Sequence, residues 1–207
     1  MPSLQYQPVK PKTVVSNNTR QFCLPSDLKL GDKFNAIPKA GLTIMADTAV
    51  KLMQKHHQLC GGTVITEEGQ RLIVDVSKAE WIQRELSGLK VAVFYKYQAE
   101  REALIQVLGE CCDTPEAFNQ AEGAARIYLQ IQSGREGVNL STADMLVMYN
   151  IDFAAVSYWQ ARARMQTFDR TEPAKVLWLM FEGGIERRIY EQVMDKKDFT
   201  LQHYRTI

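Results

Sequence analysis

The feature that most constrains the fold is an alternation, from residue 77 onward, of short apolar runs with segments of helical periodicity. Such apolar runs are typical of strands buried on both faces, and strands that alternate with helices form parallel sheets covered on both sides. We therefore predict an α/β domain over residues 77–207. The expected strands are 91–95, 127–131, 145–149 and 176–181, and the expected helices are 78–86, 98–108, one that begins at 113–116, 155–166 and 185–194.

Two segments of different character precede this domain. Residues 1–41 are rich in proline and polar side chains, which predicts an extended arm or linker with room for a short strand. Residues 42–76 combine a helical pattern over 42–59, ended by Gly61-Gly62, with two short apolar runs that indicate a hairpin. We interpret 42–76 as a lead-in to the α/β domain.

Composition excludes several classes of protein. Lys plus Arg is 25 and Asp plus Glu is 24, so the net charge of +1 excludes a uniformly basic coat but allows a local basic patch. No apolar run approaches the roughly 20 residues that cross a bilayer, and the N-terminus lacks the pattern of a secretory signal. We expect a cytoplasmic protein with no membrane partner. His56, His57 and Cys60 offer half of a metal site at most, so we expect no bound metal.

Two segments have the composition of phosphate-binding sites. Ser133-Gly134-Arg135-Glu136-Gly137 follows an expected strand, and its glycines would let main-chain amides approach a phosphate. An ordinary turn between a strand and a helix explains the same loop. On the expected helix 155–166, Gln160 and Arg164 share a face, Arg162 points elsewhere, and Arg170 follows. Guanidinium groups at the carboxyl edge of a sheet suit phosphate recognition, although a solvated charged face has the same spacing.

The sequence lacks two elements of a complete nucleotidase. It contains no Gly-Lys dipeptide, hence no phosphate loop of the Gly-x-x-x-x-Gly-Lys-Ser/Thr type, and no Asp-Glu dipeptide for magnesium and water activation. A chain with phosphate-binding arginines but neither element can be half of such an enzyme.

Residues 127–170, with 175–199, resemble the second RecA-like lobe of superfamily-two helicases, most closely the Swi/Snf-type DNA translocases and their compact phage and prophage versions. Gly137-Val-Asn139-Leu and the following Ala-Asp pair match helicase motif V. Gln160-Ala and Arg164 match motif VI, and residues 91–104 resemble motif IV. The likeness extends over roughly residues 45–200 and implies a RecA-like parallel sheet with helices on both faces.

The resemblance implies that ATP binds between this lobe and an N-terminal RecA-like lobe, which carries the phosphate loop and holds most of the Mg²⁺ coordination. Thr167 occupies the place where the family commonly has a second arginine, and Arg170 is a candidate to replace it. The expected partner is DNA, in double-stranded form. The implied ATP-binding residues are Gly137, Asn139, Gln160 and Arg164, the implied catalytic residues are Arg164 and Arg170, and the implied nucleic-acid contacts are Lys96, Tyr97, Ser133, Gly134 and Arg135.

Two functional hypotheses follow. The first is the C-terminal motor lobe of an ATP-dependent translocase or helicase, which supplies motifs IV, V and VI and is inactive without its partner lobe. The second is a non-catalytic module that binds nucleic acid or protein through a degenerate helicase lobe, and Thr167 favours this alternative slightly.

Overall fold

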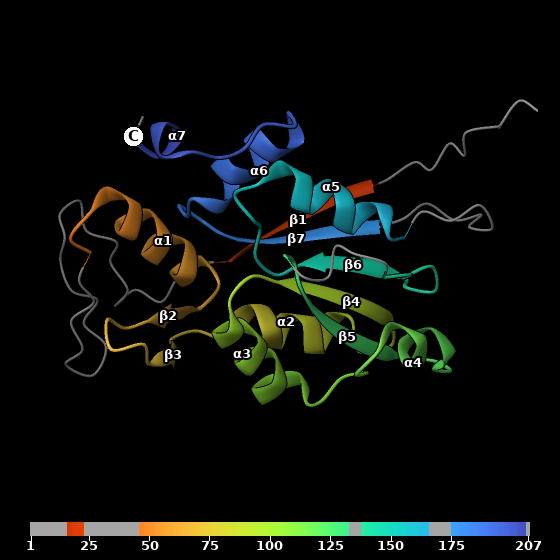
Figure 1. Ribbon diagram of the computed structural model, residues 1–207. Helices are drawn as coiled ribbons and strands as arrows, with labels where there is room; N and C mark the ends of the chain where they lie inside the picture. Colours follow the sequence, from red (N-terminus) through yellow and green to blue (C-terminus); the bar gives the residue numbers. More distant parts are fainter. Residues whose placement is uncertain (1–15, 23–45, 133–137, 166–174, 206–207) are drawn as a thin grey trace, which may run out of the picture.

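The computed structural model describes residues 16–22, 46–132, 138–165 and 175–205, which form a five-stranded sheet in the order β1-β7-β6-β4-β5 (Figure 1). Every neighbouring pair in this sheet is parallel. The structure confirms the predicted fold class, a parallel α/β sheet of RecA-like type. The strands are β1 (Ser16–Phe22), β4 (Lys90–Tyr95), β5 (Ala125–Gln130), β6 (Met145–Met148) and β7 (Lys175–Phe181).

Helices cover both faces of the sheet. Val91 and Val93 of β4 belong to the same apolar cluster as the buried side chains of α2 (Ser77–Glu85) and α3 (Gln98–Leu108). Ala92 and Phe94 point to the opposite face, because side chains alternate along a strand. That face packs against α5 (Ala155–Ala163) and α6 (Glu186–Met194), and α4 (Pro115–Gln120) lies beside β5.

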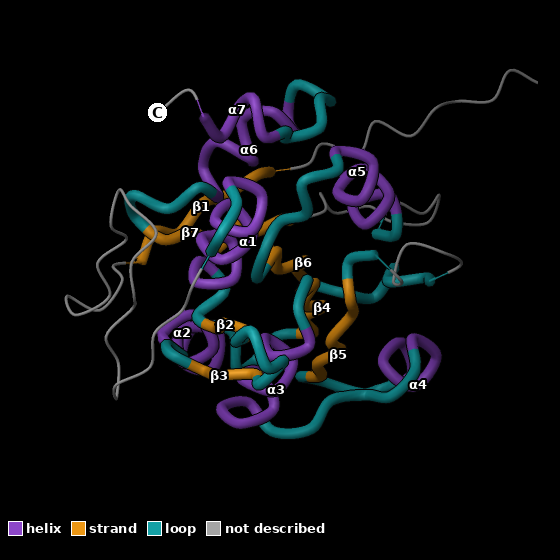
Figure 2. The backbone as a smooth tube through the Cα atoms, turned by 60° about the vertical axis from the view of Figure 1, so that its left-hand side comes forward, coloured by secondary structure: helices purple, strands orange, loops and turns teal. Residues whose placement is uncertain are grey.

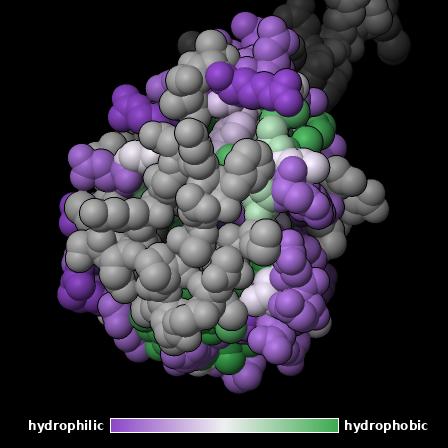
Figure 3. All heavy atoms as spheres, turned by 90° about the vertical axis from the view of Figure 1, so that its left-hand side faces the viewer, coloured by the Kyte–Doolittle hydropathy of each residue, from purple (hydrophilic) through white to green (hydrophobic). Residues whose placement is uncertain are grey.

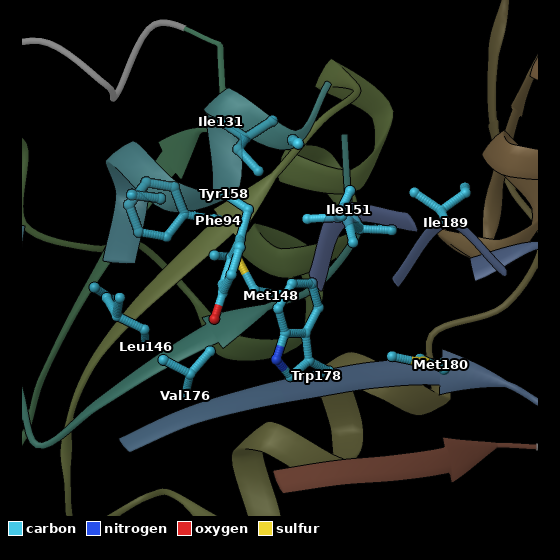
Figure 4. Close-up of a cluster of buried hydrophobic side chains, with 14 of the residues drawn as sticks. Phe94, Ile131, Leu146, Met148, Ile151, Tyr158, Val176, Trp178, Met180 and Ile189 are labelled. Carbon is cyan, nitrogen blue, oxygen red and sulfur yellow. The ribbon is translucent and has the colours of Figure 1, made fainter. Parts of the chain in front are cut away.

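The larger core lies between the sheet and α5 and α6. Figure 4 shows Tyr158 of α5 and Trp178 of β7 at its centre, with ring centroids 4.6 Å apart. Phe94, Met148 and Val176 extend this core across three strands (Figure 4). The apolar runs of the sequence are therefore buried on both faces, as predicted.

The lead-in forms a helix and a hairpin at one end of the sheet (Figure 2). Thr48 caps α1 (Ala49–Cys60) by accepting a hydrogen bond from the main-chain N–H of Lys51, so the helix begins later than the predicted residue 42. Gly61 is its C-cap, which confirms the predicted stop at Gly61-Gly62. The predicted hairpin is confirmed, and it contacts α3. Its antiparallel strands are β2 (Thr63–Ile65) and β3 (Arg71–Ile73), and a short helix, α7 (Leu201–Arg205), contacts α1.

The remaining elements agree with the sequence to within a few residues, and α7 is the described helix that the sequence patterns do not predict. Thr114 caps α4 and Pro115 occupies its first turn, as predicted. The expected arm, 1–41, contains strand β1, which pairs with β7 along seven residues and forms an edge of the main sheet. The local sequence allows a strand there but does not identify its partner, which lies far along the chain.

The face of the molecule that carries α1 is shown in Figure 3, where the described side chains around its rim are mostly hydrophilic. Within the described ranges, no helix combines the length and the apolar composition needed to cross a membrane.

Candidate functional site

The carboxyl edge of the sheet contains a buried ion pair between α2 and α6. The Lys78 side chain is 1% exposed, and its Nζ lies 2.7 Å from Oε1 of Glu186. The same Nζ donates to the carbonyl oxygens of Cys60 (2.6 Å) and Tyr149 (3.0 Å). Burial raises the pKa of Glu186 to about 7, although Lys78 and the N–H of Phe181 work to lower it. Through these contacts the side chain of Lys78 links α2 to α6, to the end of α1 and to the residue that follows β6.

A second buried carboxylate, Glu100, organises the start of α3. Its Oε2 accepts hydrogen bonds from the main-chain N–H groups of Lys96 (2.8 Å) and Tyr97 (3.0 Å). Its Oε1 accepts a hydrogen bond from Asn150 Nδ2 (2.5 Å), which also donates to the carbonyl of His57. Burial raises the pKa of Glu100. Glu100 therefore fixes the main chain of Lys96 and Tyr97, two of the residues predicted to contact nucleic acid.

Lys96, a predicted nucleic-acid contact, is engaged within the protein. Its side chain is 9% exposed, and Nζ lies 2.5 Å from Asp152 Oδ1 and 4.2 Å from the centre of the Phe153 ring. Burial works to raise the pKa of Asp152, but Lys96 and a hydrogen bond from Ser157 outweigh it, and the pKa is lowered. Contact of Lys96 with a phosphodiester stays a prediction, and it requires the ammonium to exchange Asp152 for phosphate.

Tyr97, the neighbouring predicted contact, packs against the lead-in. Its hydroxyl lies 2.9 Å from Nδ1 of His57, whose side chain is fully buried. Burial, together with Lys96, holds the pKa of His57 well below its usual 6.5. The ring of Tyr97 is half-buried, so its role in nucleic-acid binding also stays a prediction.

Two segments that resemble motifs V and VI meet at the other end of α5. This helix runs for nine residues from the carboxyl end of β6 back across the sheet (Figure 1). At its end, the carbonyl of Arg164 accepts a hydrogen bond from the main-chain N–H of Leu140 (3.1 Å). Asp144 fixes the same segment to the first residue of β4, since its Oδ2 accepts from Lys90 N (2.7 Å).

This arrangement corrects one expectation. We expected these arginines at the carboxyl edge of the sheet, but α5 ends near the amino ends of the strands (Figure 1), where Arg164 is hydrogen-bonded to Leu140 in the segment that leads into β6. The physical reason is the length of α5, which carries its last turn to the opposite end of the sheet.

The guanidinium of Arg164 has the surroundings of an anion-binding group. The side chain is half-buried, and its Nε is buried with no hydrogen-bond partner among the described residues. Leaving such a donor unsatisfied is unfavourable, and an anion would satisfy it. Arg162 points elsewhere, as predicted, because its guanidinium lies 4.9 Å from the Trp159 ring. Gln160, one turn before Arg164, is exposed.

Asn139, in the segment that resembles motif V, is exposed and hydrogen-bonded to its neighbours. Its side-chain oxygen accepts a hydrogen bond from the N–H of Ser141 (2.9 Å), and its carbonyl accepts one from Asn119 of α4 (2.9 Å). Asn119 also accepts a hydrogen bond from the Thr142 hydroxyl (2.7 Å). Asn119 was not predicted, because a polar residue on a short helix is ordinarily solvated.

The other predicted site residues lie outside the described residues. They are Ser133, Gly134, Arg135, Gly137, Thr167 and Arg170. In the described ranges, no group of three or more His, Cys, Asp or Glu side chains is placed to hold a metal ion. His56 and His57 are instead hydrogen-bonded to Tyr204 and Tyr97, and burial raises the pKa of Cys60 to about 12.

Sequence reasoning missed the buried polar groups at the carboxyl edge, namely Lys78, Glu100, Asn150, Asp152 and Glu186. Asp152 follows an expected strand, and this position was a usable signal. Lys78 and Glu186 stand in first turns of helices, where charged side chains are ordinarily exposed, so their burial depends on contacts distant in sequence.

Comparison with known proteins places the chain near chromatin-remodelling ATPases. It is 31% identical over 150 residues to the human SWI/SNF-related matrix-associated actin-dependent regulator of chromatin subfamily A member 1, which covers 62% of this chain and 14% of that protein. It is 30% identical over 86 residues to the chromatin-remodeling ATPase INO80 of Gibberella zeae, which covers 42% of this chain and 4% of that protein. No family model matches the sequence.

The chain is thus weakly homologous to Swi/Snf-type remodelling ATPases and spans about a seventh of the human relative. These two relatives are eukaryotic, so they give no support to the expected likeness to phage versions. A solved structure of the C-terminal part of the Fun30 ATPase domain shares 17% identity, with a TM-score of 0.46 over 62% of this chain and 46% of that one, a likeness too low to build on.

Proposed function

We propose that this chain is the C-terminal motor lobe of an ATP-dependent nucleic-acid translocase or helicase of the Swi/Snf type. One observation carries the proposal. Arg164, at the motif VI position, has a buried Nε without a partner among the described residues and is hydrogen-bonded through its carbonyl to Leu140 of the motif V segment. The geometry fits an arginine that completes a phosphate site from outside, as motor lobes do for the opposite lobe.

The similarity to remodelling ATPases supports this assignment at the level of the family. The phosphate loop and most of the Mg²⁺ coordination belong, in this proposal, to a separate N-terminal RecA-like lobe. The nucleotide would supply the phosphoryl group that is transferred to water in the space between the two lobes.

Within this lobe, each residue has a separate task. Arg164 donates hydrogen bonds to the γ-phosphate oxygens and stabilises the charge that grows on them during transfer. Gln160, one turn earlier and exposed, and Asn139, on the adjoining segment, orient the nucleotide from the same side. Asn119 positions Asn139 through its carbonyl. We propose that Gly137 and Arg170 extend this site, with Arg170 in the place of the arginine that Thr167 does not provide.

Duplex DNA is the proposed track. Ser133, Gly134 and Arg135 would contact the phosphodiester backbone, and Lys96 and Tyr97 would join when Lys96 leaves Asp152. Backbone contacts of this kind hold the strand without reading its sequence. Closure of the two lobes on ATP and their opening after hydrolysis would then move the protein along DNA.

The experiment compares ATP hydrolysis by the isolated chain with that by the two-lobe protein, this chain together with its phosphate-loop lobe, each with and without duplex DNA. We expect no turnover by the isolated chain, and turnover by the two-lobe protein that rises when DNA is added. Turnover by the isolated chain contradicts the half-motor account. A two-lobe protein that binds DNA but never hydrolyses ATP favours the non-catalytic alternative.

A further inference from the structure

We propose that a second surface, formed by Val156, Trp159 and Arg162 of α5 and by Lys196 after α6, binds an acidic peptide segment of a partner protein that carries an apolar anchor residue. We call it the Trp159 surface. It does not depend on the proposed motor function, because positions 162 and 164, two residues apart at the end of α5, do not share a side of the helix.

The Trp159 surface is a shallow apolar hollow on the outside of the lobe. Val156, Trp159 and Arg162 are spaced by three residues, which places them along one side of the helix. Val156 is 50% exposed and, with Val50, is one of the two large hydrophobic side chains exposed in the described part of the chain. A cavity of about 410 Å³ adjoins it, and the residues that line this cavity are Ala155, Val156, Trp159, Lys196 and Asp198.

Two cations flank the indole of Trp159 without an acidic partner. The Arg162 guanidinium lies 4.9 Å and the Lys196 ammonium 5.2 Å from the ring centroid. No described carboxylate forms an ion pair with either, and the Nε of Arg162 is buried without a hydrogen-bond partner in the same part of the chain. Arg162 is half-buried and Lys196 is exposed, and both place positive charge beside an apolar ring, where it attracts a carboxylate.

The indole itself is fixed in place. Its Nε1 donates a hydrogen bond to the carbonyl of Val193 (3.0 Å), and its ring meets Tyr158 edge-on. A rigid aromatic side chain of this kind anchors a ligand with little loss of conformational entropy. The carboxylate of Asp198 is already engaged, because its Oδ1 accepts the main-chain N–H of Ala155 (2.8 Å) at the start of α5.

The backbone of Lys196 ends α6. Lys196 follows the C-cap Asp195 and has φ 60°, and it is the one non-glycine residue with positive φ within the described ranges. A left-handed residue at this position is a common way to end a helix. The N–H of Lys196 is held by the carbonyl of Val193 (3.0 Å), which turns the chain so that the ammonium reaches the Trp159 ring.

The combination favours a peptide over a nucleic acid. Val156 and Ala155 line the cavity with apolar surface, which suits a hydrophobic side chain and which a phosphodiester backbone does not match. The two cations beside the Trp159 ring suit Asp or Glu next to that hydrophobic residue.

The test measures binding of a fluorescent twelve-residue peptide, in which a central Leu-Phe pair is flanked by Asp and Glu, to the full chain by fluorescence anisotropy. Comparison ligands are the same peptide with Lys in place of the acids, one with Ala in place of Leu-Phe, and a single-stranded DNA of twenty nucleotides. We expect only the acidic apolar peptide to bind, with an affinity that falls as salt rises.

Val156→Asp is expected to weaken binding about tenfold and Lys196→Glu at least about fivefold, since both alter the centre of the contact. Val50→Asp, on the exposed face of α1, is the matched control and should bind as the wild type does. Circular dichroism checks that each variant is folded. The proposal is overturned if no peptide binds, if the Lys peptide binds equally well, if Val50→Asp and Val156→Asp have equal effects, or if Val156→Asp weakens DNA binding instead.

Discussion

Three buried or half-buried cations of this lobe differ in what surrounds them. Lys78 and Lys96 each have a carboxylate in contact, Glu186 at 2.7 Å and Asp152 at 2.5 Å. Arg164 has no described ion pair, and its Nε is buried without a partner. A buried donor without an acceptor is unfavourable, so the surroundings of Arg164 favour the binding of an anion. Lys78 already has a carboxylate partner, and its role is structural.

Gly61 tests the packing of the carboxyl edge. A Cβ at this position would meet the carboxylate of Glu100 and lie 2.9 Å from Nδ2 of Asn150. We expect Gly61→Ala to lower the free energy of unfolding by about 1–3 kcal/mol, as overpacked sites do. Gly88→Ala is the control, because nothing lies within 4 Å of its Cβ, and its stability should change little. Urea denaturation measures both, and equal stabilities for the two variants would contradict the close packing.

His57 predicts a pH dependence of stability. Its pKa in the folded protein is well below the 6.5 of the unfolded chain, because burial and Lys96 disfavour the charged ring. The unfolded state therefore binds more protons below pH 6.5, and this contribution to stability is lost as pH falls, by up to about 1.4 kcal/mol per pH unit. Glu186, whose pKa is raised to about 7, acts in the opposite direction between 4.5 and 7.

The comparison with His57→Gln isolates the histidine, because Glu186 is common to both proteins. At pH 7.5 the variant is expected to be less stable than the wild type, since the contact with Tyr97 is altered. The difference should shrink as pH falls to 5.5. A difference that is constant across this range would show that His57 is not held neutral.

At the scale of elements, α5 joins the carboxyl edge of the sheet to Arg164, and the ends of α1, α2 and α6 meet around Lys78. The sequence predicted the existence and type of these elements because each has a strong local pattern. It did not predict where the end of α5 lies relative to the sheet. That position depends both on the direction in which the chain leaves β6 and on the length of the helix. It also did not predict that β1 joins β7, because parallel pairing between distant segments leaves no local signal.

Lys78→Met tests this meeting point of elements. The change leaves the Glu186 carboxylate buried without its cation and removes the hydrogen bonds to the carbonyls of Cys60 and Tyr149. We expect a loss of about 3–5 kcal/mol in the free energy of unfolding. Lys51→Met is the control, because Lys51 pairs with Asp47 at the surface with its side chain 52% exposed, and it should change stability by less than about 1 kcal/mol. If the two variants are equally stable, the buried contacts of Lys78 do not stabilise the fold.

At the scale of the whole molecule, the chain is nearly neutral, but positive charge is concentrated around α5. The net charge is +1, yet Arg162, Arg164 and Lys196 have no described ion pair and lie on and beside α5. The sequence predicted the fold class, and the role of Arg164 stays a prediction. It did not predict the internal use of Lys96, since its ion pair with Asp152 joins residues that are 56 positions apart in the chain.

The most direct measurement is the rate of DNA-stimulated ATP hydrolysis by the two-lobe protein that carries Arg164→Ala. Arg187→Ala is the control, because Arg187 is exposed on α6 and pairs only with Glu191 among the described residues. We predict that Arg164→Ala lowers kcat by about 10³-fold or more, as loss of a phosphate-contacting arginine does, while folding and DNA binding stay intact. A wild-type kcat in Arg164→Ala would contradict the assignment of Arg164 and the proposed motor site with it.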